Sequence, residues 1–172
     1  MISVLFDDVV YTDYGQFTIV SVAGGFDGDA DRFFARQVNG WVGTGVPGTV
    51  YVSFGRRSGG SRVRIEHLER EPEVGPWEDI VEASVRFPVG SDVSWESWAG
   101  DSSGPLAIPP GSYRVRVGAT GRDAGHADEF ADGVVDSYLI QFWPAPEAGD
   151  EILRTTSADA DYWNSEWGGR RT

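Results

Sequence analysis

The chain has 172 residues, of which 40% are hydrophobic and 13% aromatic, with no cysteine and a formal net charge of −13. A chain of this length and composition can bury a core without disulfides or a structural metal, and it fits one domain. The missing cysteines exclude a disulfide framework, a thiolate zinc site and a cysteine nucleophile, while 27 acidic against 14 basic residues make nucleic acid and anionic membranes poor partners.

Short runs rich in β-branched and aromatic residues recur along the chain, separated by clusters of Gly, Pro, Asp and Ser. The predicted strands are Gln16–Val22, Thr49–Phe54, Arg62–Leu68, Asp79–Phe87, Ser112–Ala119, Asp136–Trp143 and Glu151–Thr155. Only Asp29–Val38 has the pattern of a short helix. About eight strands and one short helix predict an all-β fold, a single-domain antiparallel β-sandwich over residues 1–172 with a Trp-rich C-terminal extension from about residue 143.

Alternation of side chains assigns faces in two of these runs. In Arg62–Leu68, Val63 and Ile65 are predicted to face the core, opposite the charged residues between them. In Ser112–Ala119, the inward residues are predicted to be Tyr113, Val115, Val117 and Ala119, and the outward ones Arg114 and Arg116.

The run Gly43–Gly48 (GTGVPG) matches the glycine spacing of a dinucleotide-binding loop. Such a loop needs a helix after it, whose N-terminal N–H groups bind the pyrophosphate. Here a predicted strand follows and Pro47 stiffens the loop, so the run is predicted to be a turn.

Asp27, Asp29 and Asp31 alternate as the carboxylates of an EF-hand loop do. The sixth position of that loop should be Gly and the twelfth Glu, but here they are Arg32 and Val38. The pattern fails as an EF-hand, which leaves a loose surface calcium site or an acidic cap on the predicted helix.

His67 and His126 are the only histidines and share no short motif, and no serine lies in a nucleophile elbow. We therefore predict no cofactor, no metal and no enzymatic activity. An enzyme with a pair of catalytic carboxylates stays open, because the spacing of such a pair is three-dimensional. Carbohydrate binding stays open as well, since the chain has seven tryptophans, although large aromatic side chains mostly pack in the core.

The segment 123–136 carries five carboxylates and no arginine or lysine: Asp123, Asp128, Glu129, Asp132 and Asp136. It lies between two predicted strands, so we expect a long exposed connection. Clustered like charges favour a surface that binds a basic protein partner. The alternative is a solvated loop, and a GC-rich genome or a salty cytoplasm would also explain the acidic composition.

Five short stretches resemble, in order, the competence protein J family of bacterial nuclease inhibitors and span about three quarters of the chain. They are Tyr14–Phe17, Gly48–Phe54, Leu106–Tyr113, His126–Asp128 and Asp136–Ile140. The resemblance implies an inhibitor of a nuclease or toxin, an immunity-type protein. This chain departs from the family in an extended middle, residues 66–79, and in its Trp-rich tail, and no inhibitory residue can be carried over.

The sequence therefore predicts an acidic inhibitor that occludes the basic active-site cleft of a nuclease or toxin. The alternatives are a carbohydrate- or calcium-binding β-sandwich module and an enzyme with an unrecognised carboxylate site. Because the N-terminus lacks the basic and long apolar regions of a signal peptide, we expect a cytoplasmic protein. No stretch approaches the ~20 apolar residues that span a membrane.

Overall fold

The computed structural model describes residues 1–21, 30–97, 102–127 and 133–169. Within these ranges the chain forms eleven strands and three short helices. The strands are β1 (Ile2–Thr12), β2 (Gln16–Val20), β3 (Val42–Gly43), β4 (Thr49–Ser53), β5 (Gly59–Leu68), β6 (Asp79–Phe87), β7 (Val93–Ser97), β8 (Ser103–Leu106), β9 (Gly111–Thr120), β10 (Ser137–Pro144) and β11 (Glu151–Arg154). The helices are α1 (Ala30–Phe33), α2 (Arg122–Ala127) and α3 (Ala158–Glu166).

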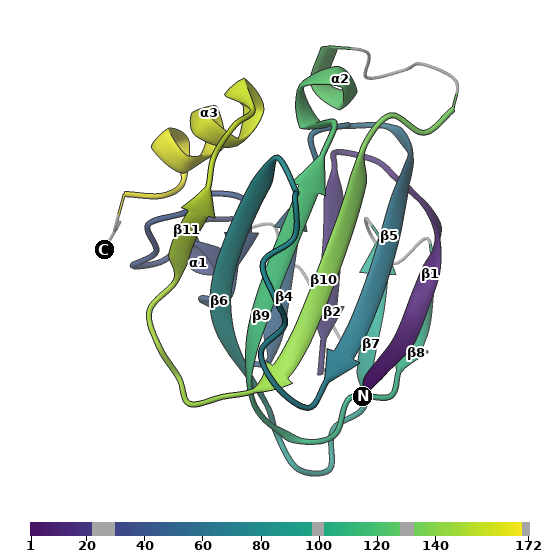
Figure 1. Ribbon diagram of the computed structural model, residues 1–172, viewed down its shortest axis with the longest axis vertical. Coiled ribbons are helices and arrows are strands. Elements are labelled where there is room, and N and C mark those ends of the chain that lie inside the picture. The colour runs from purple at the N-terminus through teal and green to yellow at the C-terminus, as the bar shows by residue number, and fades with distance from the viewer. Residues whose placement is uncertain (22–29, 98–101, 128–132, 170–172) are drawn as a thin grey trace.

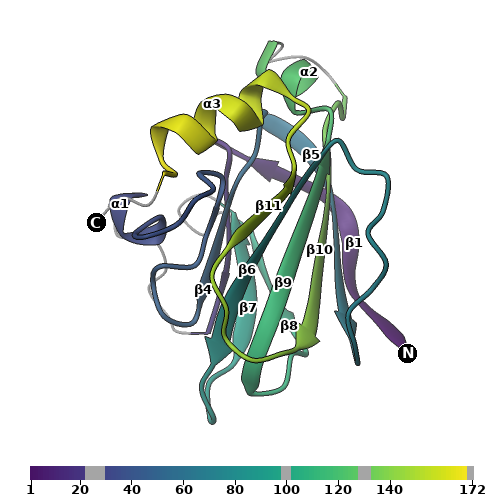
Figure 2. The same ribbon diagram turned by 60° about the vertical axis from the view of Figure 1, so that its left-hand side comes forward.

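The strands form two sheets that lie as two layers, with α2 and α3 at one end (Figures 1 and 2). The larger sheet has the order β1-β5-β10-β9-β6-β11 and the smaller one β3-β4-β2-β7-β8. The β-rich character predicted from the sequence is confirmed. The prediction of an entirely antiparallel arrangement is wrong at one pair, because β10 runs parallel to β5.

One hydrophobic cluster joins the inner faces of both sheets. Val63 and Ile65 are fully buried, as their alternation predicts. The inward residues of β9 belong to the same cluster. From the smaller sheet, β2 and β4 contribute Phe17, Ile19, Val50 and Val52. Alternation therefore predicted the core faces of β5 and β9 correctly.

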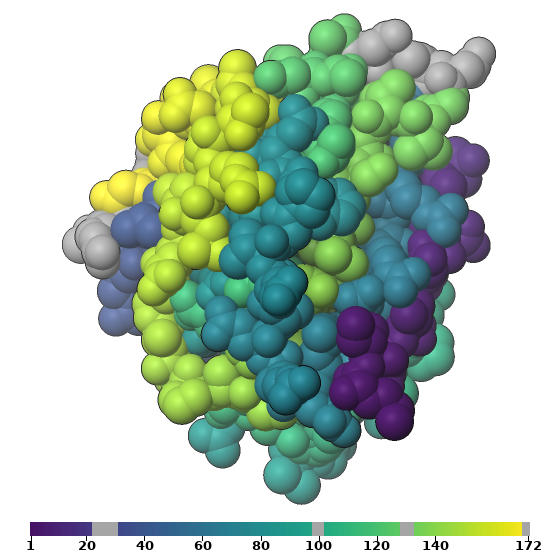
Figure 3. Space-filling view, in the orientation of Figure 1, coloured from purple at the N-terminus to yellow at the C-terminus, as the bar shows by residue number. Residues whose placement is uncertain are grey.

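Arg116 points away from this core, as predicted, yet it is only 3% exposed. The extended middle of the chain covers it, and Figures 1 and 3 show residues 69–78 crossing the outer face of the larger sheet. The Arg116 guanidinium donates to the Pro72 carbonyl (2.8 Å) and to the carboxylates of Glu71 (3.0 Å) and Glu82 (2.7 Å). A side chain at Gly118 would collide with the Trp77 ring, so a glycine is required there.

Several elements were not predicted, namely β1, β3, β7, β8, α2 and α3. In β1 the register shifts between Val4 and Phe6. The shift breaks the alternation that would mark a strand of eleven residues. The predicted helix Asp29–Val38 is reduced to the four residues of α1, and Asp29 lies outside the described residues.

The glycine-rich run Gly43–Gly48 leads from the last residue of β3 into a turn, as predicted. The Thr49 N–H donates to the Val46 carbonyl (3.2 Å), and β4 begins at Thr49. Of the possible calcium ligands, Asp27 and Asp29 lie outside the described residues. Among the helices that the structure describes, none is long and apolar enough to cross a membrane.

Candidate functional site: the α2–α3 end and a groove at the edge of β6

Helices α2 and α3 lie side by side at one end of the molecule (Figures 1 and 2). Asp123 in α2 joins them, because its carboxylate accepts the N–H groups of Ala158 (3.1 Å) and Asp159 (2.8 Å) at the start of α3. The Ser157 hydroxyl caps the same helix by accepting the Ala160 N–H (3.0 Å). Negative charge is favourable at the N-terminus of a helix, so Asp123 has a structural role.

Arg122 is 1% exposed and lies beneath these helices. Its Nη2 atom is 2.7 Å from Oδ2 of Asp159. The two atoms form a charge contact rather than an aligned hydrogen bond, since neither satisfies hydrogen-bond geometry. Nη1 donates to the Ser53 carbonyl (2.6 Å), and the guanidinium lies 4.5 Å from the centre of the Trp41 ring. The buried charge is thus compensated by one carboxylate and by two aromatic rings, Trp41 and, at 6.0 Å, Tyr138.

Asp136, which directly precedes β10, is 1% exposed. Its carboxylate accepts the hydroxyls of Ser61 (2.6 Å) and Tyr138 (2.8 Å) and the N–H of Arg56 (3.3 Å). The Tyr138 oxygen accepts the Gly55 N–H (2.7 Å), and burial raises the pKa of Tyr138 well above its usual range. Asp136 is therefore the centre of a buried hydrogen-bond network that fixes the end of the acidic segment.

The structure separates the five predicted partner-binding carboxylates. Asp136 is buried and has hydrogen-bond partners within the chain, and Asp123 caps α3. Asp128, Glu129 and Asp132 lie outside the described residues, and their role stays a prediction. Sequence reasoning missed the buried cations Arg122 and Arg56, because nothing in a local pattern distinguishes a buried arginine from an exposed one.

The two histidines lie on different elements. His126 in α2 is exposed, with Nδ1 3.7 Å from Oδ1 of Asp159. His67 in β5 packs edge-on against Tyr113, and burial lowers the pKa of its imidazole. Among the described residues, no three histidine or carboxylate side chains are grouped so that they could hold a metal ion.

The tryptophans that the structure describes are all buried or half-buried, and Trp98 lies outside the described residues. Trp41 is fully buried, and Trp143 is 5% exposed beside the Arg116 guanidinium. Trp95 packs between Phe6 and Phe17. These tryptophans are packing residues, so they do not form the exposed aromatic platform on which a sugar would stack.

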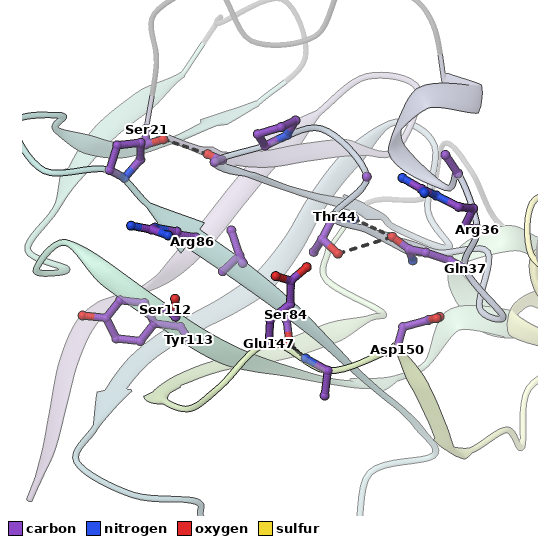
Figure 4. A pocket seen from close by; sticks show the side chains of 18 residues that line it. Ser21, Arg36, Gln37, Thr44, Ser84, Arg86, Ser112, Tyr113, Glu147 and Asp150 are labelled. Atoms are coloured by element: carbon purple, nitrogen blue, oxygen red, sulfur yellow. Dashed lines mark hydrogen bonds between the residues drawn. The ribbon is translucent and has the colours of Figure 1, made fainter. Parts of the chain in front are cut away.

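A cavity of about 750 Å³ lies beside β6 (Figure 4). We call it the β6 groove. One wall comes from the segments after α1 and before β4, the floor from β6 and β9, and the other wall from the loop before β11. Its polar lining residues are Ser21, Arg36, Gln37, Thr44, Ser84, Arg86, Ser112, Tyr113, Glu147 and Asp150.

Comparisons with known proteins identify the fold. No protein-family model matches the chain, and no curated protein matches its sequence. Two solved structures resemble it. One is crocagin biosynthetic gene J, with a TM-score of 0.56, 15% identity and coverage of 85% of this chain and 99% of that chain. The other is ComJ from Bacillus subtilis, an inhibitor of the DNA-degrading activity of NucA, with a TM-score of 0.57, 17% identity and coverage of 84% of this chain and 99% of that chain. The chain therefore shares its fold with a nuclease inhibitor, as the five short stretches of its sequence suggested.

Proposed function

We propose that this protein is a non-catalytic inhibitor that binds a basic protein, a nuclease or a toxin, and covers its active-site cleft. The observation that carries the proposal is the fold shared with ComJ, which matches almost the whole of that inhibitor. We interpret the two-sheet scaffold as a β-sandwich. Since one fold can serve many functions, the proposal also needs support from the chemistry of the surface.

The charge of the chain provides that support. Nucleases bind phosphates, so their clefts are lined with cations. A protein with a formal net charge of −13 is attracted to such a cleft and competes with the nucleic acid for it. At physiological salt the electrostatic attraction between the protein and its partner is screened beyond about 8 Å. Association of the two proteins should therefore slow as salt is added.

The proposed contact is the acidic loop between α2 and β10, with Asp128, Glu129 and Asp132 as its charges. Both ends of this loop are held by buried contacts. Arg122 anchors α2 on one side, and Asp136 anchors β10 on the other. The guanidinium of Arg56 also donates to the Gly133 carbonyl at the end of the loop.

The test is inhibition of DNA cleavage by a panel of basic nucleases that includes NucA and any nuclease encoded beside this gene. We expect the protein to inhibit at least one of them, with an association rate that falls as salt rises. The triple variant Asp128→Asn, Glu129→Gln, Asp132→Asn should associate roughly tenfold more slowly, because removing rim charges changes mainly the on-rate.

A matched control removes three exposed carboxylates elsewhere, with Asp8→Asn, Glu73→Gln and Asp92→Asn. This control has the same net charge as the loop variant, so it separates a local effect from a global one. Equal loss in both variants would overturn the loop assignment. If no nuclease in the panel were inhibited at large molar excess, the inhibitor proposal itself would be wrong.

A further inference from the structure

A patch of exposed apolar side chains lies at the end of the molecule that carries α2. Four of the twelve exposed large apolar side chains that the structure describes belong to it: Tyr11 in β1, Tyr14 in the β1–β2 turn, and Val134 and Val135 before β10. Figures 1 and 2 show that the end of β1, the start of β5 and the start of β10 meet there. Single exposed apolar residues are common, whereas a cluster of them is a candidate binding surface. We call this set the tyrosine patch.

Pairing across β5 places Tyr11 and Val135 in one row. Tyr11 lies opposite Gly60 in the antiparallel β1–β5 pair. The parallel β10–β5 register, extended by two residues beyond Ser137, places Val135 opposite the same Gly60. Residues opposite one another in a sheet share a face. Val10, the neighbour of Tyr11, belongs to the core, so Tyr11 and Val135 flank Gly60 on the outer face of the sheet.

The acidic segment ends beside this row. A side chain on Gly60 would begin 3.1 Å from the Tyr11 ring, so the ring packs over the Gly60 backbone. The Arg56 guanidinium links Gly60 to the end of the segment, because its Nη1 atom donates to the carbonyls of both Gly60 (3.4 Å) and Gly133. Gly133 and Val134 are the first described residues after the acidic loop. The tyrosine patch therefore borders the proposed binding loop.

Tyr14 is held in a strained conformation in the turn between β1 and β2. Its φ of 59° lies in the left-handed region, which bulky side chains avoid. The Gly15 N–H fixes the turn by donating to the Arg57 carbonyl (2.9 Å), and the Arg57 guanidinium lies 5.8 Å from the centre of the Tyr14 ring. Because the ring is 57% exposed, burial returns little of the cost of this conformation. A strained residue with an exposed aromatic side chain points to a role in binding.

The composition of the tyrosine patch favours a protein as its partner. Tyrosine and arginine are enriched at protein interfaces, where a polar rim surrounds the centre. Arg57 is exposed beside Tyr14, and the exposed Asp13 lies between the two tyrosines in the chain. A net charge of −13 repels anionic membranes and nucleic acid and attracts a basic protein. The charge and the bordering acidic loop thus both favour the basic partner proposed above.

We propose that the tyrosine patch is the apolar centre of the surface that binds the basic partner, with Tyr11 and Tyr14 as its main contacts and the acidic loop at its rim. This assignment rests on the proposed inhibitor function and adds to it the side chains that hold the partner in place. Rim charges mainly speed association, whereas aromatic side chains buried at the centre of an interface mainly slow dissociation. The two groups of residues should therefore affect different rate constants.

The experiment measures association and dissociation rates by surface plasmon resonance, with the nuclease of the panel that the wild-type protein inhibits most strongly. Tyr11→Ala and Tyr14→Gly should each speed dissociation roughly tenfold or more and change the association rate by less than about twofold. The matched control is Tyr162→Ala, which removes a ring of similar exposure (54%) from α3. Helix α3 follows β11, at the opposite edge of the larger sheet from β1, so both rates should stay at their wild-type values.

Urea denaturation of the same variants separates a loss of contact from a loss of fold. Glycine adopts a φ of 59° without strain, so the denaturation midpoint of Tyr14→Gly should equal or exceed that of wild type. Wild-type dissociation rates in both tyrosine variants, or faster dissociation together with a lower midpoint in both, would overturn the patch and leave the inhibitor proposal intact. If the wild-type protein inhibited no nuclease of the panel, the inhibitor proposal and the patch would both be wrong.

Discussion

The centre of the molecule and its α2–α3 end both contain buried side chains, but the side chains are of different kinds. Between the sheets the core consists of apolar side chains such as Ile140 and Val117, which are fully buried. At the α2–α3 end, four ionisable side chains are nearly as buried: Arg56, Arg122, Asp136 and Asp159. The centre needs only apolar side chains of suitable volume, whereas each charge at the end needs a particular partner.

This difference matters for function. A buried charge with specific partners fixes the positions of those partners as well as stabilising the fold, because a displaced partner leaves an unpaired charge or hydroxyl. The proposed binding loop is attached at the end that is built in this way. Changes there should have larger and more specific effects than changes of similar size in the apolar core, and three substitutions test that expectation.

The largest effect is expected from Arg122→Met, which leaves the buried carboxylate of Asp159 without its cation. Removing one partner of a buried ion pair costs about 3–5 kcal/mol of unfolding free energy. The measurement is urea denaturation followed by tryptophan fluorescence. Adding Asp159→Asn to the same protein should recover part of the loss, because the unpaired charge is then gone. An equally large loss in the double variant would show that charge is not the cause.

A smaller loss is expected from Asp136→Ala, which removes the acceptor shared by Ser61 and Tyr138. Leaving buried hydroxyls unsatisfied should cost about 2–3 kcal/mol. The exposed Asp8→Ala is the control, and its unfolding free energy should stay within about 0.5 kcal/mol of wild type. If Asp136→Ala were as stable as this control, Asp136 would not have the structural role that its contacts indicate.

The smallest loss is expected from Ile140→Val in the apolar core, where Ile140 pairs with Ile65 and Val117 on the neighbouring strands. Deleting one buried methylene group should lower the unfolding free energy by about 1 kcal/mol. The same denaturation experiment measures it. A loss larger than that of Arg122→Met would reverse the comparison between the two regions.

Much of the fold follows from local patterns in the sequence. The alternation in β5 and β9 identifies both the strands and their core faces, because side chains on successive residues point to opposite sides. The glycine-rich turn before β4 was also correctly predicted. Where the local pattern is interrupted, as at the register shift in β1, the strand was missed. The helices α2 and α3 were missed because each is short and has little apolar periodicity.

The sequence by itself determined the β-rich composition, the faces of its clearest strands and the acidic balance of the chain, since these depend on residue type and on neighbours in the chain. The tertiary structure decided which charges are available. Asp136 and Asp123 look like surface carboxylates in the sequence. In the structure Asp136 accepts hydrogen bonds from Ser61 and Tyr138, and Asp123 accepts one from the first turn of α3. Where Tyr11 and Val135 lie relative to each other depends on how β1 and β10 pair with β5. Such features arise from contacts between residues far apart in the chain, and no local pattern encodes them.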